Sequence, residues 1–191
     1  MLIVVLACTA CAGAASASVQ GDLSAQPAGA RSPCRAAALK ALCRGVQASG
    51  GSLSGAVVLV NAGGRPCWLT GTPPSVTLLN EDGGGAIAVK SRPLALPVNA
   101  GEVELAPGGE LPGFGAAPAH GSAWFTVTWS NWCGDTTPAV QALLVVLPAG
   151  GSVAAPLDTA VPSLVVSPAA PRCDDGRAGS TLAIGRFQAA A

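Results

Sequence analysis

Short apolar runs separated by clusters of Gly, Pro, Asn and Asp dominate the chain after its first fifty residues. Ser122–Trp132 is the longest run, and its odd-numbered residues from Ala123 to Trp129 are apolar, which predicts a strand with one buried face. Gly55–Asn61 is almost continuously apolar, which is typical of a central strand. Further strands are predicted at Ser75–Leu79, Ala86–Lys90, Glu102–Leu105, Gln141–Leu147, Ser163–Val166 and Thr181–Phe187.

The glycine-rich segment Asn80–Gly85 predicts a hairpin turn between two of these strands. About eight strands, with no long amphipathic helix between them, indicate an all-β antiparallel sandwich. One short helix is expected before the first strand. Ser32 and Pro33 are typical of a helix start, and Leu39, Leu42, Cys43 and Val46 follow at helical spacing.

Residues 1–17 form an uncharged, strongly apolar segment that resembles an export signal. It is shorter than the roughly 20 apolar residues that a membrane span requires. Cys11 and Cys8 are candidates for lipidation, whereas Ala15–Ala17 matches a cleavage site for free secretion. The prediction is an extracytoplasmic protein, with a cell-surface lipoprotein favoured over free secretion. Residues 18–32 read as a flexible tether, and residues 33–188 as a single domain.

Five cysteines follow the signal segment, and in an exported domain they predict disulfides. In the predicted helix Cys34 and Cys43 would lie about 13.5 Å apart by helical rise, beyond the roughly 7 Å that a disulfide allows between Cα atoms. Helix geometry thus excludes only the Cys34–Cys43 pair. The expected pairs are Cys133–Cys173 and Cys34–Cys67, with Cys43 as a buried free thiol, and the alternative is that Cys43 is bonded in place of Cys34.

Charge and composition narrow the classes of partner. Ten basic and ten acidic residues balance, so the chain offers no electrostatic signal for nucleic acid or for an anionic membrane, and contact with a membrane is expected only through a lipid anchor. No C-x-x-C pair occurs after the signal segment and His120 is the single histidine, so neither a metal nor a cofactor is expected.

Three tryptophans suggest a binding surface. Trp68, Trp124 and Trp132 fall at strand ends or on the face predicted to be exposed, where indole rings favour contact with a protein or an envelope component. Glu102 and Glu104 share one strand face and could imitate the paired carboxylates of a glycosidase. A solvated edge that prevents strand aggregation is the favoured interpretation of these two residues.

Other acidic and nucleophilic motifs have plainer explanations. Asp174–Gly176 and Glu81–Gly83 could each offer oxygens to calcium, but both lack the spaced ligands of a calcium loop and are typical of turns. No G-x-S-x-G motif accompanies His120, so no catalytic triad is predicted.

Several motifs resemble one known family. These are Cys67-x-Leu69-x-Gly71-x-Pro73 after the glycine-rich turn at Asn61, an L-x-P-G-G turn at Leu105–Gly109, and the W-x-N-W-C segment Trp129–Cys133. They are similar to an actinobacterial secreted and lipoprotein domain of unknown function. The resemblance implies an immunoglobulin-like, four-cysteine extracellular domain without assigned activity, from which Cys43 departs as a fifth cysteine.

These observations favour a monomeric, non-catalytic binding or structural domain at the cell envelope. Its partner is an unidentified protein or envelope component. The alternative is a secreted hydrolase that uses surface carboxylates. A passive structural domain without a specific ligand is a third hypothesis.

Overall fold

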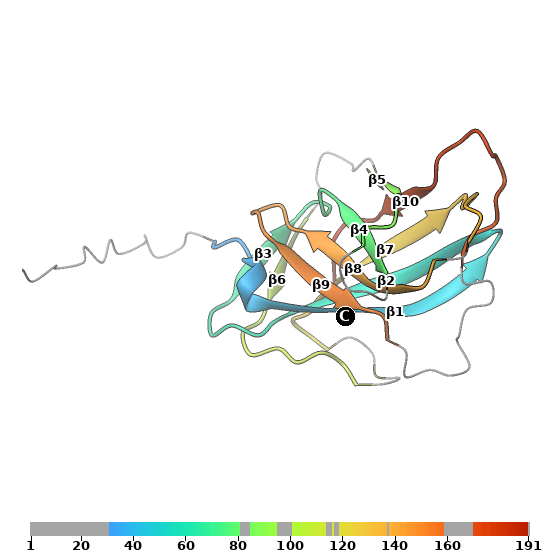
Figure 1. The fold of residues 1–191 in the computed structure, drawn as a ribbon. Coiled ribbons are helices and arrows are strands. Elements are labelled where there is room, and N and C mark those ends of the chain that lie inside the picture. The colour runs from blue at the N-terminus through green and yellow to red at the C-terminus, as the bar shows by residue number, and fades with distance from the viewer. Residues whose placement is uncertain are drawn as a thin grey trace, which may run out of the picture. The chain divides into compact units, whose positions relative to one another are not determined.

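The computed structural model describes residues 31–80, 85–94, 101–113, 116, 119–136, 138–158 and 170–190 (Figure 1). Within these residues the chain is all-β, with eleven strands and one 3-10 turn, η1 (Ala36–Ala38). No helix in this part of the chain is long and apolar enough to cross a membrane. The predicted export signal, most of the tether and the strand expected at Ser163–Val166 lie outside the described residues.

The strands vary from two to eleven residues in length. Their bounds are β1 Leu39–Ser49, β2 Ser52–Asn61, β3 Cys67–Thr70, β4 Val76–Asn80, β5 Lys90–Pro93, β6 Glu102–Leu105, β7 Ala123–Ser130, β8 Val140–Val146, β9 Ser152–Pro156, β10 Thr181–Ile184 and β11 Gln188–Ala189.

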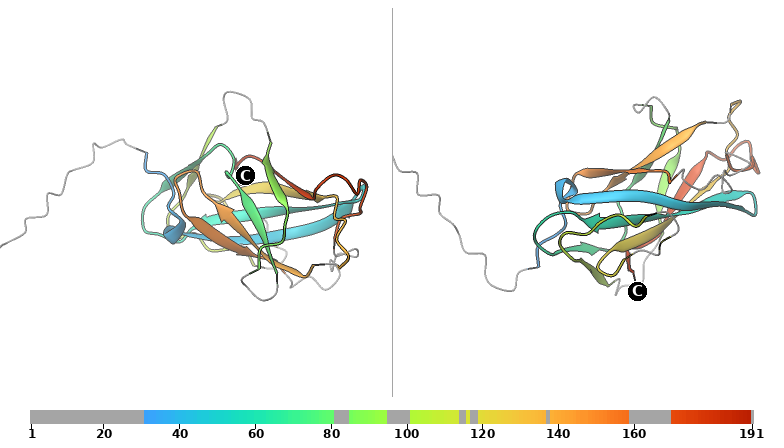
Figure 2. Two further views of the ribbon diagram at one scale, coloured as in Figure 1. Left: turned by 45° about the horizontal axis from the view of Figure 1, so that its top comes forward. Right: turned by 90° about the horizontal axis from the view of Figure 1, so that it is seen from below.

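Three sheets surround one apolar core. The large sheet has the order β1-β2-β7-β10-β5, and β11 also pairs with β7; the smaller sheets are β4-β8-β9 and β3-β6. Every strand pair is antiparallel except β5–β10. Two contacts join the β4-β8-β9 sheet to the edges of the large one. The Ser91 hydroxyl of β5 donates to the Val76 carbonyl and accepts the Val76 amide, and Cys43 of β1 forms a β-bridge with Leu157 just after β9. Figure 2 shows the ribbon of these strands from two further sides.

The predicted N-terminal helix is wrong, because Leu39–Ser49 is a strand paired with β2 along almost its whole length. Leu39, Ala41 and Cys43 alternate toward the core and are all buried. Gly50 and Gly51, with φ of 56° and 83°, form the two-residue hairpin turn into β2. The segment expected to be a helix is therefore the first strand of a β-hairpin.

The helix-like spacing has a physical origin in the opposite face of this hairpin. Val58 and Val60 of β2 point away from the main core, yet they are only 2% and 1% exposed. The segment after β6 crosses them: the Gly109 amide donates to the Asn61 carbonyl at 2.7 Å, and a side chain at Gly109 would meet Val60. Because both faces are partly covered, apolar residues occupy both, and the period of two expected for a strand is obscured.

Arg44 of β1 binds the segment after β6 that covers Val58 and Val60, here called the covering segment (residues 106–113 and 116). Its guanidinium donates to the Ala116 carbonyl at 2.6 Å and the Gly113 carbonyl at 3.3 Å, and it pairs with Asp158 at 3.3 Å. Both partners of the ion pair are largely buried, with side chains 16% and 12% exposed. The pair therefore links β1, the residues after β9 and the covering segment.

Most other predicted strands are present: β6 has the predicted ends, and β2, β4, β7, β8 and β10 have shifted ends. The hairpin expected after β4 begins as predicted, with Leu79 bridging Ala86, but the chain then leaves β4. Lys90–Pro93 instead pairs with β10 in the large sheet. The short strands β3, β9 and β11 were not predicted.

Candidate functional site

The three tryptophans proposed as a binding surface lie in three different settings. Trp68 is on β3, Trp124 is near the start of β7, and Trp132 follows the end of β7. About 20 Å of extended strand separates Trp124 from Ser130 at the other end of β7. All three are half-buried rather than exposed, so the structure does not unite them into one aromatic surface.

Trp132 contributes to packing. Its ring meets that of the buried Trp129 edge-to-face, with centroids 5.6 Å apart, and its indole N–H donates to the Thr136 carbonyl at 3.0 Å. Trp129 in turn donates to the Ser180 hydroxyl at 2.7 Å. Aromatic pairs with satisfied indole groups are typical of core edges. Trp132 is therefore part of the structure at this end of β7.

Trp68 lies opposite Glu104 in the β3–β6 pair. The alternate residues of both strands are buried, so Trp68, Glu104 and Glu102 share the outward face, as the sequence predicted for the two glutamates. Arg31 forms an ion pair with Glu102, and both side chains are well exposed. Two exposed carboxylates on an outward strand face, one of them paired with a cation, form a solvated surface and not the cleft in which glycosidase carboxylates lie on either side of the substrate.

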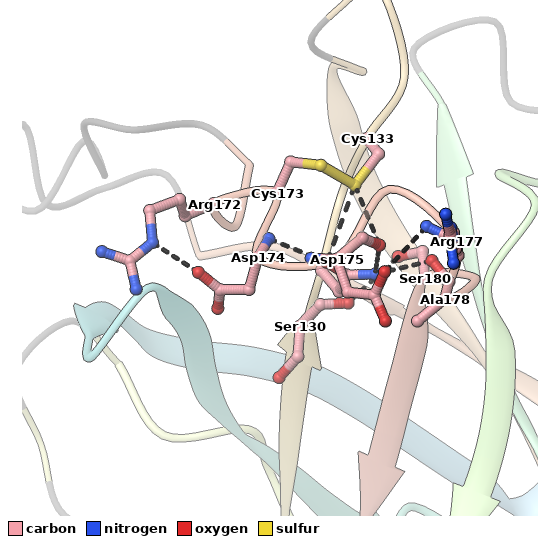
Figure 3. Close-up of a disulfide and its surroundings, with 10 residues drawn as sticks. Ser130, Cys133, Arg172, Cys173, Asp174, Asp175, Arg177, Ala178 and Ser180 are labelled. Atoms are coloured by element: carbon pink, nitrogen blue, oxygen red, sulfur yellow. Dashed lines mark hydrogen bonds and ion pairs between the residues drawn. A yellow bond between two sulfur atoms is a disulfide. The ribbon is translucent and has the colours of Figure 1, made fainter.

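Asn131, which the sequence did not indicate as a site residue, hydrogen-bonds the loop after Cys173. Figure 3 shows Asp174 and Asp175 of this loop beside the Cys133–Cys173 disulfide. Its side-chain oxygen accepts from the amides of Asp174 and Asp175, both at 2.9 Å. Its side-chain nitrogen donates to the carbonyls of Asp175 at 2.9 Å and Ala178 at 2.6 Å. Asn131 has φ of 60°, a left-handed conformation that asparagine tolerates better than most residues. The sequence signal was the asparagine of the W-x-N-W-C segment.

The acidic loop expected to be a turn behaves as one. The Asp174 carboxylate pairs with Arg172 at 2.6 Å, and the Asp175 carboxylate accepts the Arg177 amide at 2.9 Å. Such local bonds are the usual function of aspartate in turns. Glu81–Gly83, the other candidate calcium loop, lies outside the described residues. Among the residues that the structure does describe, no three acidic, cysteine or histidine side chains gather to hold a metal.

Asn61 holds the turn before Cys67 in the same way, through hydrogen bonds from its side chain to the backbone. This buried side chain donates to the Arg65 carbonyl at 2.7 Å and accepts the Gly63 amide at 2.9 Å. Beyond β3, Gly71 has φ of 70° and its carbonyl accepts the Phe187 amide at 2.9 Å. The C-x-L-x-G-x-P motif therefore fixes a turn and a strand end.

The structure joins Cys34 to Cys67 and Cys133 to Cys173, the pairs expected from the sequence, and leaves Cys43 as a buried free thiol. The helical spacing argument for these pairs is not the reason for them, since no helix forms. Cys34 instead lies beside β3 because the Cys34 amide donates to the Trp68 carbonyl at 3.0 Å. The two disulfides indicate an oxidising, extracytoplasmic environment.

We expect the two disulfides to differ in reducibility. Cys133 and Cys173 are exposed, whereas Cys34 and Cys67 are 1% and 7% exposed. Because thiol–disulfide exchange requires access of the attacking thiolate, dithiothreitol under native conditions should cleave Cys133–Cys173 first. Alkylation followed by peptide mass spectrometry measures the order. Cleavage of both bonds at one rate would show that the protein opens globally before either reacts.

Burial also raises the pKa of the Cys43 thiol, from an ordinary 9.0 to about 12. Between these values the unfolded chain binds fewer protons than the folded one, so stability falls as the pH rises above 9. We expect the free energy of unfolding to be about 1.4 kcal/mol lower at pH 10 than at pH 8. Urea titrations of the wild type and of Cys43→Ala measure this, and the alanine variant should lack this part of the decrease. The absence of tyrosine simplifies the comparison.

Comparison with protein families matches residues 34–112 to the model described as "Domain of unknown function (DUF4232)". The match includes both cysteines of the Cys34–Cys67 disulfide, the Asn61 turn and the L-x-P-G-G turn. The chain is thus similar to a domain of unknown function over this region, and the W-x-N-W-C segment lies outside the match. No curated protein matches the chain, and no solved structure does.

Proposed function

We propose that this protein is an exported, non-catalytic domain that binds a protein or another component of the cell envelope. The observation that carries the proposal is the pair of disulfides around a single all-β core, in a chain that begins with an apolar, uncharged segment. Such staples are retained in oxidising compartments. The three sheets and their shared core support an immunoglobulin-like β-sandwich, and the proposal takes the protein to be a monomer.

The proposal includes a lipid anchor at Cys11 or Cys8. A cysteine among small residues after an apolar stretch supports this, and residues 18–32 would separate the anchor from the folded domain. The test is the intact mass of protein purified from its native cells, with Cys11→Ala and Cys8→Ala variants. A diacylglyceryl adduct lost in one variant identifies the anchor. An unmodified chain beginning at Ser18 would establish free secretion instead.

The hydrolase alternative rests on Glu102 and Glu104. Their exposure and the ion pair of Glu102 with Arg31 favour a solvated surface. The double variant Glu102→Gln/Glu104→Gln distinguishes the two functions, because a hydrolase would lose turnover of envelope glycans whereas a binding domain would keep its affinity.

Binding itself is tested by co-sedimentation of the purified protein with an insoluble envelope preparation. Trp68→Ala and Trp124→Ala are the informative variants, since Trp132 packs against Trp129 and its removal would disturb the fold. A binding domain sediments with the envelope in a saturable manner. A protein that stays in the supernatant at all concentrations would be a passive structural domain.

A further inference from the structure

The outward side of the large sheet carries a polar surface that no motif of the sequence indicated. It consists of four hydroxyl side chains and two cations, and we name it the polar face: Ser52, Ser54, Thr128, Ser130, Lys90 and Arg92. These residues come from β2, β7 and β5, and β10 lies between the last two strands.

Strand register places the polar face in two rows across the sheet. Ser130 pairs with Thr181, which pairs with Lys90; Thr128 pairs with Ala183, which pairs with Arg92. Paired residues project to the same side of a sheet. The hydroxyls of Ser52 and Ser130 lie 2.8 Å apart, and those of Ser54 and Thr128 lie 3.0 Å apart.

The direction of β5 is fixed by its central serine. Ser91 bonds the backbone of Val76 on β4, so it points toward the opposite sheet. Its neighbours Lys90 and Arg92 therefore point outward, and both are exposed. The two cations stand about 7 Å apart along the strand, at the edge of the hydroxyl rows.

Basic residues predominate in the large sheet, although the chain as a whole has no net charge. The six strands of the large sheet contain four basic residues and no acidic residue. Among the described strands, Glu102 and Glu104 on β6 are the only carboxylates. Of the four basic residues, Arg44 is paired with Asp158 and Lys40 lies on β1 at the other edge of the sheet, so Lys90 and Arg92 are the two cations of the polar face. Exposed cations of this kind attract an anionic partner.

The chemistry of the face favours sugars over other anions. Each hydroxyl both donates and accepts hydrogen bonds, which matches the hydroxyls of a sugar ring. The face holds no large apolar side chain; Leu94, 53% exposed, lies beyond its edge. Protein interfaces are centred on aromatic and apolar residues. Two cations are also few for nucleic acid, whose charge requires many contacts.

We propose that the polar face binds an acidic polysaccharide, a chain of sugar rings bearing carboxylates, with Lys90 and Arg92 pairing the carboxylates and the serine and threonine rows bonding the sugar hydroxyls. This inference rests on the proposed binding function and assigns its ligand class. Trp124 is the one of the three tryptophans that shares this side of the sheet, since it alternates with Thr126 and Thr128 along β7.

The test uses polygalacturonate as the probe, with calorimetry at low and moderate salt. We expect saturable binding that weakens with salt, and at least a tenfold loss of affinity in Lys90→Gln/Arg92→Gln. Arg65→Gln is the matched control, because Arg65 is exposed in the turn before β3, outside the polar face, and its removal should leave affinity unchanged. Dextran, a neutral polysaccharide, should not bind measurably.

Several outcomes would overturn the inference. One is that the wild type and the double variant bind polygalacturonate with equal affinity. Another is that the wild type binds dextran as tightly as polygalacturonate. A third is that it binds polyglutamate as tightly as polygalacturonate, which would indicate an acidic protein partner. The wild type could also fail to bind polygalacturonate while the double variant aggregates. That result would show that Lys90 and Arg92 protect the edge strand β5 from aggregation and bind no ligand. If the wild type and the double variant sediment equally with the envelope preparation, the proposed binding function stands and this ligand assignment fails. If neither protein sediments with it, the binding function and the ligand assignment both fail.

Discussion

Replacement of both Cys34 and Cys67 by alanine should lower the free energy of unfolding by about 4 kcal/mol. This disulfide closes a loop of 33 residues, and the loss of that constraint on the unfolded chain sets the magnitude. It also attaches the segment before η1 to β3, and both sulfurs are buried in the core. Guanidinium titration of the oxidised wild type and the double variant measures the change.

Cys43→Ala is the matched control for this experiment. Cys43 is equally buried but unbonded, so its replacement removes only packing and should cost no more than about 1–2 kcal/mol. A double variant no less stable than the control would show that the disulfide does not constrain the unfolded chain. If the double variant does not fold, the wild type can be used instead. Its exposed disulfide, Cys133–Cys173, is first reduced and alkylated, and the free energy of unfolding is then measured before and after reduction of Cys34–Cys67.

Asn131→Ala should lower stability by about 3 kcal/mol. Four hydrogen bonds to the loop after Cys173 would be lost, at about 0.5 kcal/mol each for partly exposed groups, and alanine would hold φ of 60° at a further cost of about 1 kcal/mol. Thermal or guanidinium unfolding measures the total. Because the loop is no longer held in place, dithiothreitol should also reduce Cys133–Cys173 faster in this variant than in the wild type.

Asn131→Gly separates the two contributions, because glycine adopts the left-handed conformation without strain. It should cost about 2 kcal/mol, less than alanine by the backbone contribution. Equal loss in the two variants would mean that the backbone conformation relaxes in the absence of the side chain. No loss in either would show that the disulfide alone holds the loop.

The order of the strands along the chain was largely accessible to sequence analysis, whereas the beginning of the domain was not. Alternation in β7 identified its buried face, from Ala123 to Trp129, and the structure buries those residues. Leu39–Ser49 was assigned to a helix because Leu42 is apolar on the side away from the core. A segment more than sixty residues later, pinned by Arg44, covers part of that side. A bulge between Arg44 and Gln47 also shifts the alternation of β1, so that Val46 packs against the core.

The candidate site separates in the same way. The sequence identified the outward position of Glu102 and Glu104, because alternation within one strand is a local property. It did not show that Trp68, Trp124 and Trp132 lie apart, since their separation depends on which strands pair. Nor did it indicate the polar face, whose residues come from three strands distant in the chain.

Local and compositional signals were enough to predict a mainly β fold, the position of most strands in the described residues and the presence of disulfides, because alternation, turn residues and cysteine number can be read without knowing which strands pair. Three features came only from the folded arrangement: Lys90–Pro93 pairs with β10 and not with β4, Asn61 and Asn131 hold turns, and part of the outward side of the large sheet is polar with two exposed cations. Each of these depends on contacts between residues far apart in the chain, which hydrophobic periodicity does not encode.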